Sequence, residues 1–307
     1  MKKILITGGA GFIGTNLISY LNENYKNIEI TVIDNQSLGK KSHIDGEVKK
    51  FYDADIREEK TFKALEVDFD TVIHLAASTR VLESIKKPSL MLENNIIGTF
   101  NLLEFCRVNE ISNVVIASTG GAIIGDTSNI ISEETLPMPI SPYGASKLSI
   151  EAFSNAYNGS YDMNISCLRF SNVYGPRSQQ KKSVIAKFFK NILNQEDLII
   201  YGDGFQERDY IYVEDIIKAI ELCIEKKASG VFQIATGTST NINSIIENMK
   251  ELAGMKFRSD ILYKDLRKGE VYKTSFSTIR AKEKINFEAK INLKEGLEKT
   301  WKWFIKN

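Results

Sequence analysis

The chain has 307 residues, enough for one large domain or two modest ones with a well-filled core. Its 40 Lys and Arg residues nearly balance 39 Asp and Glu residues, and a net charge of +1 argues against a nucleic-acid partner. The two histidines, His43 and His74, lack the neighbouring cysteines or carboxylates of a metal site. We therefore expect no metal.

The distribution of cysteines and of apolar residues indicates in which cellular compartment the protein resides. Cys106, Cys167 and Cys223 are scattered through apolar runs, as expected for small core residues in a reducing compartment. We find no signal peptide and no uninterrupted apolar stretch long enough to cross a bilayer. These features predict a cytoplasmic protein with no membrane partner.

The first predicted strand, residues 4–6, leads into a glycine-rich turn at residues 7–14 and then into a helix. Glycines let the backbone approach a ligand closely, and the amides and dipole of a helix start suit a diphosphate. The turn therefore predicts a dinucleotide-binding site. Its candidate cofactor residues are Gly8, Gly11, Phe12, Ile13 and Gly14.

A second predicted strand, residues 28–33, ends in Asp34, about twenty residues after the glycine-rich turn. An acidic residue at this position accepts hydrogen bonds from the adenosine ribose and repels a 2′-phosphate. Asp34 therefore favours NAD over NADP, although Lys40 and Lys41 leave some tolerance of NADP open.

Residues 49–57 form the next predicted strand and its acidic end. Asp55 is expected at the amino edge of the adenine and Ile56 against its face. Asp55 could equally cap a helix that begins near Glu58.

The strand predicted over residues 71–77 ends in small side chains, which leave room for the cofactor backbone. We expect His74 to be packed within this strand. A helix should follow from about residue 89 to 109, and Asn95 in it is a candidate cofactor contact. The cofactor candidates at the strand end are Leu75, Ala76 and Ala77, and the apolar positions of the helix are Leu92, Ile96, Phe100, Leu103 and Cys106.

The predicted strand of residues 113–117 delivers Ser118 and Thr119, followed by Gly120 and Gly121. Hydroxyl groups at this strand end can bond to a substrate oxygen. Ser and Thr are also common turn formers, so the pattern alone leaves both interpretations open.

Tyr143 and Lys147 lie four residues apart after Pro142, which suits a helix start, and therefore share one helical face. Lowering a tyrosine pKa from about 10 to about 7 needs roughly 4 kcal/mol. An ammonium about 5 Å away supplies roughly 3 kcal/mol, and a positively charged nicotinamide could supply the rest. We therefore expect Tyr143 to act as a base with a lowered pKa.

Six segments together resemble an extended short-chain dehydrogenase/reductase of the NAD-dependent nucleotide-sugar epimerase/dehydratase group. They follow the order of the family and run almost from end to end of the chain. The segments are residues 7–14, 34–35, 55–57, 74–77, 143–147 and 168–177.

The resemblance implies an α/β fold with a Rossmann-type doubly wound parallel sheet and a smaller C-terminal α/β substrate domain. The NAD-binding domain is expected at residues 1–171, with a returning segment at about 209–234. Residues 172–208 and 235–307 are expected to bind the nucleotide sugar.

The resemblance also implies residue roles. Tyr143 is the catalytic base, and Lys147 binds the nicotinamide ribose and depresses the tyrosine pKa. Thr119, with Ser118 as the alternative, bonds to the sugar 4-oxygen, because the simplest alignment places Gly120 at the usual Ser/Thr position. The further cofactor candidates are Asn35, Asn95 and Phe170.

On the substrate side, the resemblance places Asn172 and Arg208 on the nucleotide diphosphate. Arg267 would bind phosphate and Glu270 the uridine ribose, although Arg267 could instead form a surface ion pair. Thr274 would line the pocket near the sugar C2 group, where a small residue admits N-acetyl sugars. The alternative is that Thr274 faces solvent.

The two residues after the expected catalytic threonine distinguish between the reactions of the family. Dehydratases of the family carry Asp-Glu there, whereas Gly120 and Gly121 cannot transfer protons. We therefore expect 4-epimerisation of UDP-glucose or UDP-galactose, with their N-acetyl forms as further substrates, through a 4-keto intermediate. An NAD(P)H-dependent 4-keto-sugar reductase and a 4,6-dehydratase are the alternatives. Relatives dimerise through the helix near 95–108 and the one that carries Tyr143, so a homodimer is expected.

Overall fold

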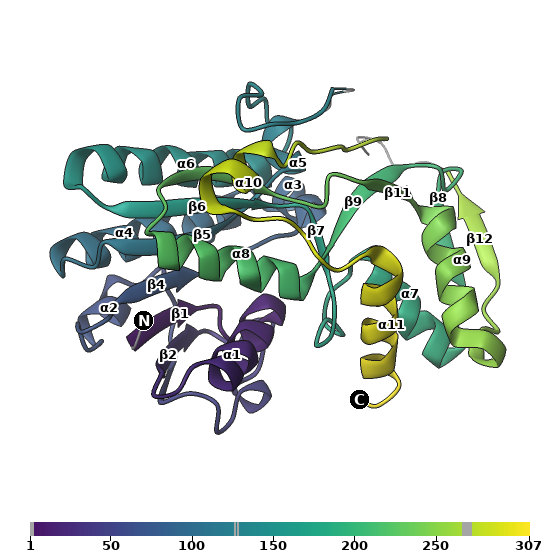
Figure 1. The fold of residues 1–307 in the computed structure, drawn as a ribbon, viewed down its shortest axis with the longest axis horizontal. Helices are drawn as coiled ribbons and strands as arrows, with labels where there is room; N and C mark the ends of the chain where they lie inside the picture. The colour runs from purple at the N-terminus through teal and green to yellow at the C-terminus, as the bar shows by residue number, and fades with distance from the viewer. Residues whose placement is uncertain (1–2, 126, 128, 266–271) are drawn as a thin grey trace.

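The computed structural model describes residues 3–125, 127, 129–265 and 272–307, and its largest element is a seven-stranded sheet (Figure 1). The strand order is β10-β6-β5-β4-β1-β2-β3, and all neighbouring strands are parallel. The order reverses between β1 and β4, which confirms the predicted doubly wound sheet. The strands are β1 (Lys3–Thr7), β2 (Glu29–Asp34), β3 (Lys50–Asp53), β4 (Thr71–His74), β5 (Asn113–Thr119), β6 (Asn164–Phe170) and β10 (Gly230–Ile234).

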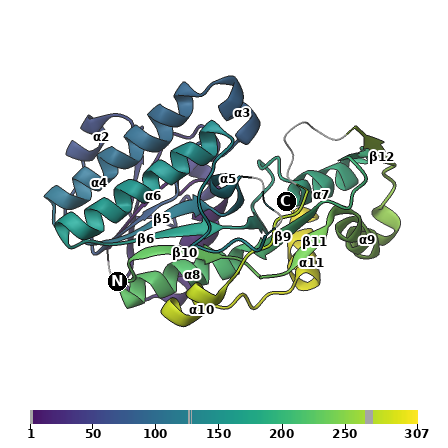
Figure 2. The same cartoon turned by 90° about the horizontal axis from the view of Figure 1, so that it is seen from above.

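Helices cover both faces of this sheet. Figure 2 shows α2, α4 and α6 on one face and α8 and α10 on the other, where α1 also packs against α8. Ile4 and Ile6 of β1 belong to the core on the α1 and α8 side, whereas Leu5 belongs to the core on the opposite side. This alternation is the two-residue period of a strand buried on both faces. The helices are α1 (Phe12–Asn24), η1 (Lys41–His43), α2 (Glu59–Lys63), α3 (Val81–Lys86), η2 (Met91–Ile97), α4 (Gly98–Val108), α5 (Gly121–Ile124), α6 (Pro142–Tyr161), α8 (Val213–Lys226) and α10 (Ile279–Ile285).

A smaller region follows the C-terminal ends of β6 and β10 and lies on the right in Figure 1. It contains the three-stranded sheet β11-β9-β7 and the two-stranded sheet β12-β8. Its elements are β7 (Asn172–Tyr174), α7 (Val184–Asn194), β8 (Leu198–Tyr201), β9 (Glu207–Tyr212), β11 (Ser239–Asn241), α9 (Ile242–Ala253), η3 (Gly254–Lys256), β12 (Ile261–Lys264) and α11 (Leu293–Phe304).

The two regions share one hydrophobic core. Phe189 of α7, Ile245 of α9 and Trp301 of α11 belong to the same buried cluster as Ile4 of β1. Helix α8 carries the chain from β9 back to the large sheet, and α10 packs against α8 and β10. A continuous core holds the regions in one orientation, so residues at their junction have a defined geometry.

The helix expected over residues 89–109 is divided in two. Its first part, η2, is a π-helix, and only the second part, α4, is α-helical. A π-helical turn is wider and shifts the register of the apolar positions that follow. As a result Leu103 is buried as predicted, but Leu92 and Phe100 are exposed, so the single apolar face predicted for them was wrong.

The predicted role of the cysteines is confirmed, because Cys106, Cys167 and Cys223 are all buried and unpaired. Within the described ranges, every helix is too short or too polar to cross a bilayer.

Candidate active site

The glycine-rich turn joins β1 to α1 at the strand-order reversal. Gly8 has a φ of +71°, and a Cβ there would lie 2.6 Å from the Ala76 nitrogen. A Cβ on Gly14 would lie 2.5 Å from the Gly9 oxygen. Gly11 differs, because among the described atoms, chain neighbours aside, a Cβ there meets only the Gly8 oxygen, at 3.2 Å. Two glycines therefore permit close backbone packing, and Gly11 leaves room for a ligand.

The first turn of α1 fits an anion. Gly11 is the N-cap and offers no side-chain acceptor, so helix amides, including those of Phe12 and Ile13, are not side-chain capped. Uncapped amides beside open space suit a diphosphate, which the positive end of the helix dipole also favours. The turn therefore fits the diphosphate of a dinucleotide.

Asp34 lies at the end of β2, beside this turn. Its carboxylate accepts hydrogen bonds from the Ala10 nitrogen at 3.0 Å and the Gln36 nitrogen at 2.8 Å, and burial raises its pKa. Each oxygen keeps a second lone pair, so the carboxylate can still accept from a ribose. The neighbouring Asn35 donates to Asp55 at 2.9 Å and ties the ends of two adjacent strands together.

Asp55 forms an ion pair with Arg57 at 2.9 Å, and hydrogen bonding from this guanidinium lowers the Asp55 pKa to about 2. Helix α2 has Glu58 as its N-cap residue, so the alternative in which Asp55 caps that helix was wrong. Ile56 is buried against Gly98, where an added Cβ would lie 2.6 Å from the Ile56 Cδ1. The adenine contacts of Asp55 and Ile56 stay a prediction.

The segment after β4 is held from both sides. The Leu75 nitrogen donates to the Thr7 oxygen at 3.0 Å. Asn95 accepts from the Ser78 nitrogen at 2.8 Å and donates to Ser146 at 2.9 Å, so this fully buried amide connects the strand end to α6. The polar atoms of the Asn95 side chain form hydrogen bonds to other residues of the protein, so Asn95 is a positioning residue in this structure. The strand-end candidates Leu75, Ala76 and Ala77 are partly exposed.

His74 is buried between Thr7, whose hydroxyl lies 2.6 Å from Nδ1, and Thr99, whose hydroxyl lies 2.8 Å from Nε2. Burial, reinforced by the nearby Lys147 charge, lowers the His74 pKa to about 3. The imidazole is therefore neutral and packed, as predicted.

Tyr143 and Lys147 are placed by the start of α6. Ser141 caps this helix and accepts from the Gly144 nitrogen at 3.1 Å, with a proline in the first turn. Both side chains are buried, and the Lys147 ammonium donates to the Ala117 oxygen of β5 at 2.8 Å. The helical pair therefore lies against the C-terminal end of β5.

Ser118 and Thr119 point to opposite sides of β5, as consecutive strand residues do. The Thr119 hydroxyl lies close enough to Tyr143 to oppose part of the rise that burial causes in the Tyr143 pKa. The Ser118 hydroxyl instead donates to Glu151 at 2.6 Å, and Glu151 forms a buried ion pair with Arg169 at 2.8 Å. The structure brings Thr119 to Tyr143 and places Ser118 on the buried ion pair.

The predicted lowering of the Tyr143 pKa depends in part on a positively charged nicotinamide, so it stays a prediction for the enzyme with its cofactor. In the protein chain alone, burial raises the Tyr143 pKa to about 12, and the nearby Thr119 hydroxyl offsets only part of this effect. Burial also lowers the Lys147 pKa to about 8. Desolvation disfavours both charged forms, so it outweighs the attraction on which the expectation was based.

Gly120 and Gly121 are closely surrounded. A Cβ on Gly120 would lie 2.7 Å from atoms of both Gln233 and Phe276. A Cβ on Gly121 would lie 3.6 Å from the Thr274 Cγ2. Thr274 is itself buried, so it lies beside the end of β5 and the solvent-facing alternative was wrong.

A pocket of about 200 Å³ opens in the smaller region. Arg208 in its wall donates to the Glu207 oxygen at 2.8 Å, and Asn172 donates to the Asp209 oxygen at 3.1 Å. Cations and amides in this arrangement suit the diphosphate of a nucleotide. The polar residues of the wall are Asn172, Tyr174, Lys182, Ser183, Gln206, Arg208 and Tyr210.

Of these polar wall residues, Asn172 and Arg208 were predicted and the others were not. Gln206 is buried, and its Oε1 lacks a hydrogen-bond partner among the described residues, so it offers an acceptor. Lys182 comes from the polar loop after β7. Gln206 lies inside the sequence stretch that carries Arg208 and could have been found from it. No pattern in the loop singles out Lys182.

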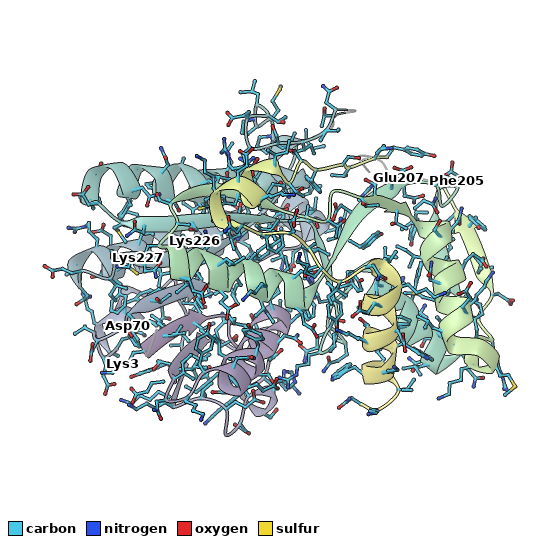
Figure 3. The ribbon with its side chains drawn as sticks, viewed as in Figure 1. Lys3, Asp70, Phe205, Glu207, Lys226 and Lys227 are labelled. Atoms are coloured by element: carbon cyan, nitrogen blue, oxygen red, sulfur yellow. The ribbon has the colours of Figure 1, made fainter. Side chains whose placement is uncertain are left out.

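Arg267 and Glu270 lie outside the described residues. The described chain resumes at Tyr272, whose oxygen accepts from the Glu207 nitrogen at 2.8 Å. Lys273 forms an ion pair with Glu207 at 2.8 Å. Figure 3 shows Glu207 and Phe205 in the smaller region, far from Lys3 at the start of β1. The segment that leads to Thr274 therefore runs along β9.

A sequence model described as "NAD dependent epimerase/dehydratase family" matches residues 4–235. The chain is 36% identical to a putative UDP-glucose 4-epimerase of Methanocaldococcus jannaschii over 99% of each chain. A solved structure of UDP-glucose 4-epimerase with UDP-glucose, from Thermotoga maritima, matches with 37% identity and a TM-score of 0.93 over 99% of each chain. A UDP-N-acetylglucosamine 4-epimerase of Methanobrevibacter ruminantium in complex with UDP-N-acetylmuramic acid has 34% identity and a TM-score of 0.91, covering 99% of this chain and 98% of that one. The chain belongs to the NAD dependent epimerase/dehydratase family.

Proposed function

We propose that this enzyme is a UDP-sugar 4-epimerase that interconverts UDP-glucose and UDP-galactose through a transient 4-keto intermediate. The observation that carries the proposal is that the buried Tyr143 and Lys147 lie one helical turn apart on α6, with the Lys147 ammonium donating to the Ala117 oxygen of β5 at 2.8 Å. These groups lie at the C-terminal end of β5, on the sheet edge that also bears the glycine-rich turn. The same edge thus offers a proton acceptor and a dinucleotide site.

We assign residues 1–171, with a return at about 209–234, to NAD and residues 172–208 and 235–307 to the nucleotide sugar. The amides near Gly11 hold the diphosphate, and Asp34 holds the adenosine ribose. NAD supplies an acceptor for the hydride of sugar C4 and a donor that returns it. The remaining proposed cofactor contacts are Asn35, Asp55, Ile56, Leu75, Ala76, Ala77 and Phe170.

Tyr143 takes the proton of the sugar 4-hydroxyl and later gives it back, while Thr119 holds the same oxygen by a hydrogen bond. Because burial raises the Tyr143 pKa to about 12, proton removal needs positive charge close to the phenol. Lys147, with a pKa of about 8, is mostly an ammonium at neutral pH and provides part of that charge.

The residues after Thr119 favour epimerisation over elimination. Loss of water across C5 and C6 needs a further acid and base, whereas Gly120 and Gly121 have no side chain. The side chains nearest to them in the described structure are those of Gln233, Phe276 and Thr274, which do not act as acids or bases. The ketone has no route to elimination from these residues, so hydride returns to it from the opposite face.

The decisive experiment assays the purified enzyme with UDP-galactose and no added NAD. Turnover to UDP-glucose is expected, because NAD is regenerated in each cycle and travels with the protein. A reductase uses the same Tyr143 and Lys147 but consumes NAD(P)H. No epimerisation, together with NADH-dependent reduction of a 4-keto sugar, would overturn the proposal.

The small Thr274 supports acceptance of N-acetyl sugars as well. Its position beside Gly121 places it next to the reacting end of the site. We expect Thr274→Tyr to lower kcat/KM for UDP-N-acetylgalactosamine at least about tenfold more than for UDP-galactose. Equal losses for the two sugars would remove Thr274 as the determinant. Thr278→Tyr, further along the chain, is the matched control.

We further propose a cytoplasmic homodimer. Its interface is the apolar face formed by α3, η2, α4 and α6; these elements pack against one another, and Figure 2 shows α3, α4 and α6 on the same face of the large sheet. The Phe100 and Phe153 rings meet at 6.0 Å across this face and remain exposed. Sedimentation of the wild type and of Phe100→Asp tests it, since the charge should yield monomers. The exposed apolar residues of the face are Leu82, Ile85, Leu92, Ile97, Phe100 and Phe153.

A further inference from the structure

The loop after β7 crosses the start of α1. We call residues 175–182 the strap. The Arg177 guanidinium donates to the Thr15 oxygen at 2.9 Å, and the Asn16 amide donates to the Pro176 oxygen at 3.0 Å. The strap begins in the smaller region and is bonded to the helix that follows the glycine-rich turn. It therefore connects the two halves of the site.

Lys181 near the end of the strap lies over the first residue of α1. Its ammonium is 5.0 Å from the centre of the Phe12 ring. A turn fixes this position, because the Lys181 nitrogen donates to the Ser178 oxygen at 2.8 Å and the Ser178 hydroxyl donates to the Gly175 oxygen at 2.6 Å. Lys181 is therefore held by its backbone.

The Lys181 ammonium has no acidic partner among the residues that the structure describes. No ion pair or side-chain hydrogen bond within these residues includes it, and burial lowers its pKa to about 8. The start of α1 carries partial positive charge, which further disfavours the charged form of Lys181. A partly buried cation beside a positive helix end is stabilised by an anion between the two.

We propose that Lys181 binds the cofactor diphosphate, with its ammonium on one side of the phosphates and the amides of the α1 start on the other. The inference rests on the proposed function, because it requires a dinucleotide in the glycine-rich turn. Lys182, the next residue, lines the other pocket with Asn172 and Arg208. Adjacent lysines of the strap thus serve different anions, and Lys181 retains NAD between turnovers.

The test measures how fast NAD bound to the holoenzyme exchanges with labelled NAD in solution. Lys181→Met removes the charge and keeps the length of the side chain. We expect exchange to be about 10- to 100-fold faster, the loss typical of a charge-assisted hydrogen bond. Lys181→Arg should stay within about threefold of the wild type, because arginine also binds phosphate. Lys190→Met, on the exposed side of α7, is the control for lost surface charge.

Three outcomes overturn the proposal. The first is unchanged exchange in Lys181→Met. The second is weaker UDP binding with unchanged NAD exchange, which would assign the lysine to the substrate diphosphate. The third is equally fast exchange in Lys190→Met. Lys181→Gln serves as a second neutral variant where Lys181→Met unfolds at a lower temperature. A wild type that carries no NAD and does not epimerise UDP-galactose contradicts the proposed function itself.

Discussion

The two halves of the site are built from different parts of the chain. On the cofactor side, the groups that we propose to face the ligand are backbone amides of the α1 start, supported by glycines at close contacts. On the catalytic and substrate side they are side chains, from Thr119 and Tyr143 to Asn172 and Arg208. A site built from backbone amides does not depend on which side chains its residues carry, but its closely packed glycines leave no space for an added side chain. A side-chain site depends on single functional groups and on what holds them.

The catalytic side gives the largest expected effect. Tyr143→Phe removes only the phenol oxygen, so the fold and NAD binding should persist while kcat falls by about 10³- to 10⁴-fold. The measurement is kcat for UDP-galactose together with the dissociation constant for UDP. Tyr157→Phe on the same helix is the control, because its hydroxyl bonds to Glu104 away from the site, and its kcat should be unchanged. If kcat of Tyr143→Phe stays within tenfold of the wild-type value, Tyr143 is not the catalytic base.

The second largest effect is expected at the buried ion pair between Glu151 and Arg169, which lies beside β5. Glu151→Gln leaves the buried Arg169 uncompensated, and Arg169 already has an unpartnered buried nitrogen, Nη1, within the described structure. We expect a loss of about 3–5 kcal/mol in the free energy of unfolding, measured with urea. Glu104→Gln breaks the more exposed pair with Arg107, for which the loss should be about 1 kcal/mol or less. Equal losses for the two variants would contradict a special role for the buried pair.

The same contrast explains how much was predictable from sequence. The first strands, the glycine-rich turn, Asp34 and the Tyr143–Lys147 spacing depend on local periodicity and turn chemistry, which a sequence displays directly, whereas the doubly wound sheet came from the family resemblance. The choice between Ser118 and Thr119 needed the structure, because it depends on which face of β5 each residue occupies.

Other features depend on contacts between distant segments. Lys182 and Lys181 lie in a loop without periodicity, and only the packing of the strap on α1 separates their surroundings. The sign of the Tyr143 pKa shift depends on burial, which spacing along a helix does not report. The π-helical turn of η2 likewise has no simple sequence signature, so it displaced Leu92 and Phe100 from the predicted face.

Lys147 offers a test through pH. Burial lowers its pKa to about 8 from 10.5, so below pH 8 folding carries the full cost of a buried ammonium. Between pH 8 and 10.5 the folded state binds fewer protons than the unfolded state, and this cost fades as the pH rises. We expect Lys147→Met to be inactive, yet more stable than the wild type at pH 7 by about 1–3 kcal/mol. Urea unfolding from pH 7 to 10 should show this difference shrinking; a growing difference would reverse the assignment.

The smallest effects are expected in the glycine-rich turn, where substitutions of Gly14 and Gly11 should have different consequences. Gly14→Ala places a Cβ 2.5 Å from the Gly9 oxygen, so the helix start must shift at a cost of about 1–3 kcal/mol. Gly11→Ala meets only the Gly8 oxygen, at 3.2 Å among the described atoms, and its φ of −77° suits any residue. The Gly11 variant should therefore keep its melting temperature but bind NAD about tenfold more weakly, or roughly 1.4 kcal/mol, because the methyl group occupies the diphosphate approach. Thermal unfolding and NAD titration of the two variants distinguish the roles, and an unchanged NAD affinity in Gly11→Ala would mean that the backbone does not face the phosphates.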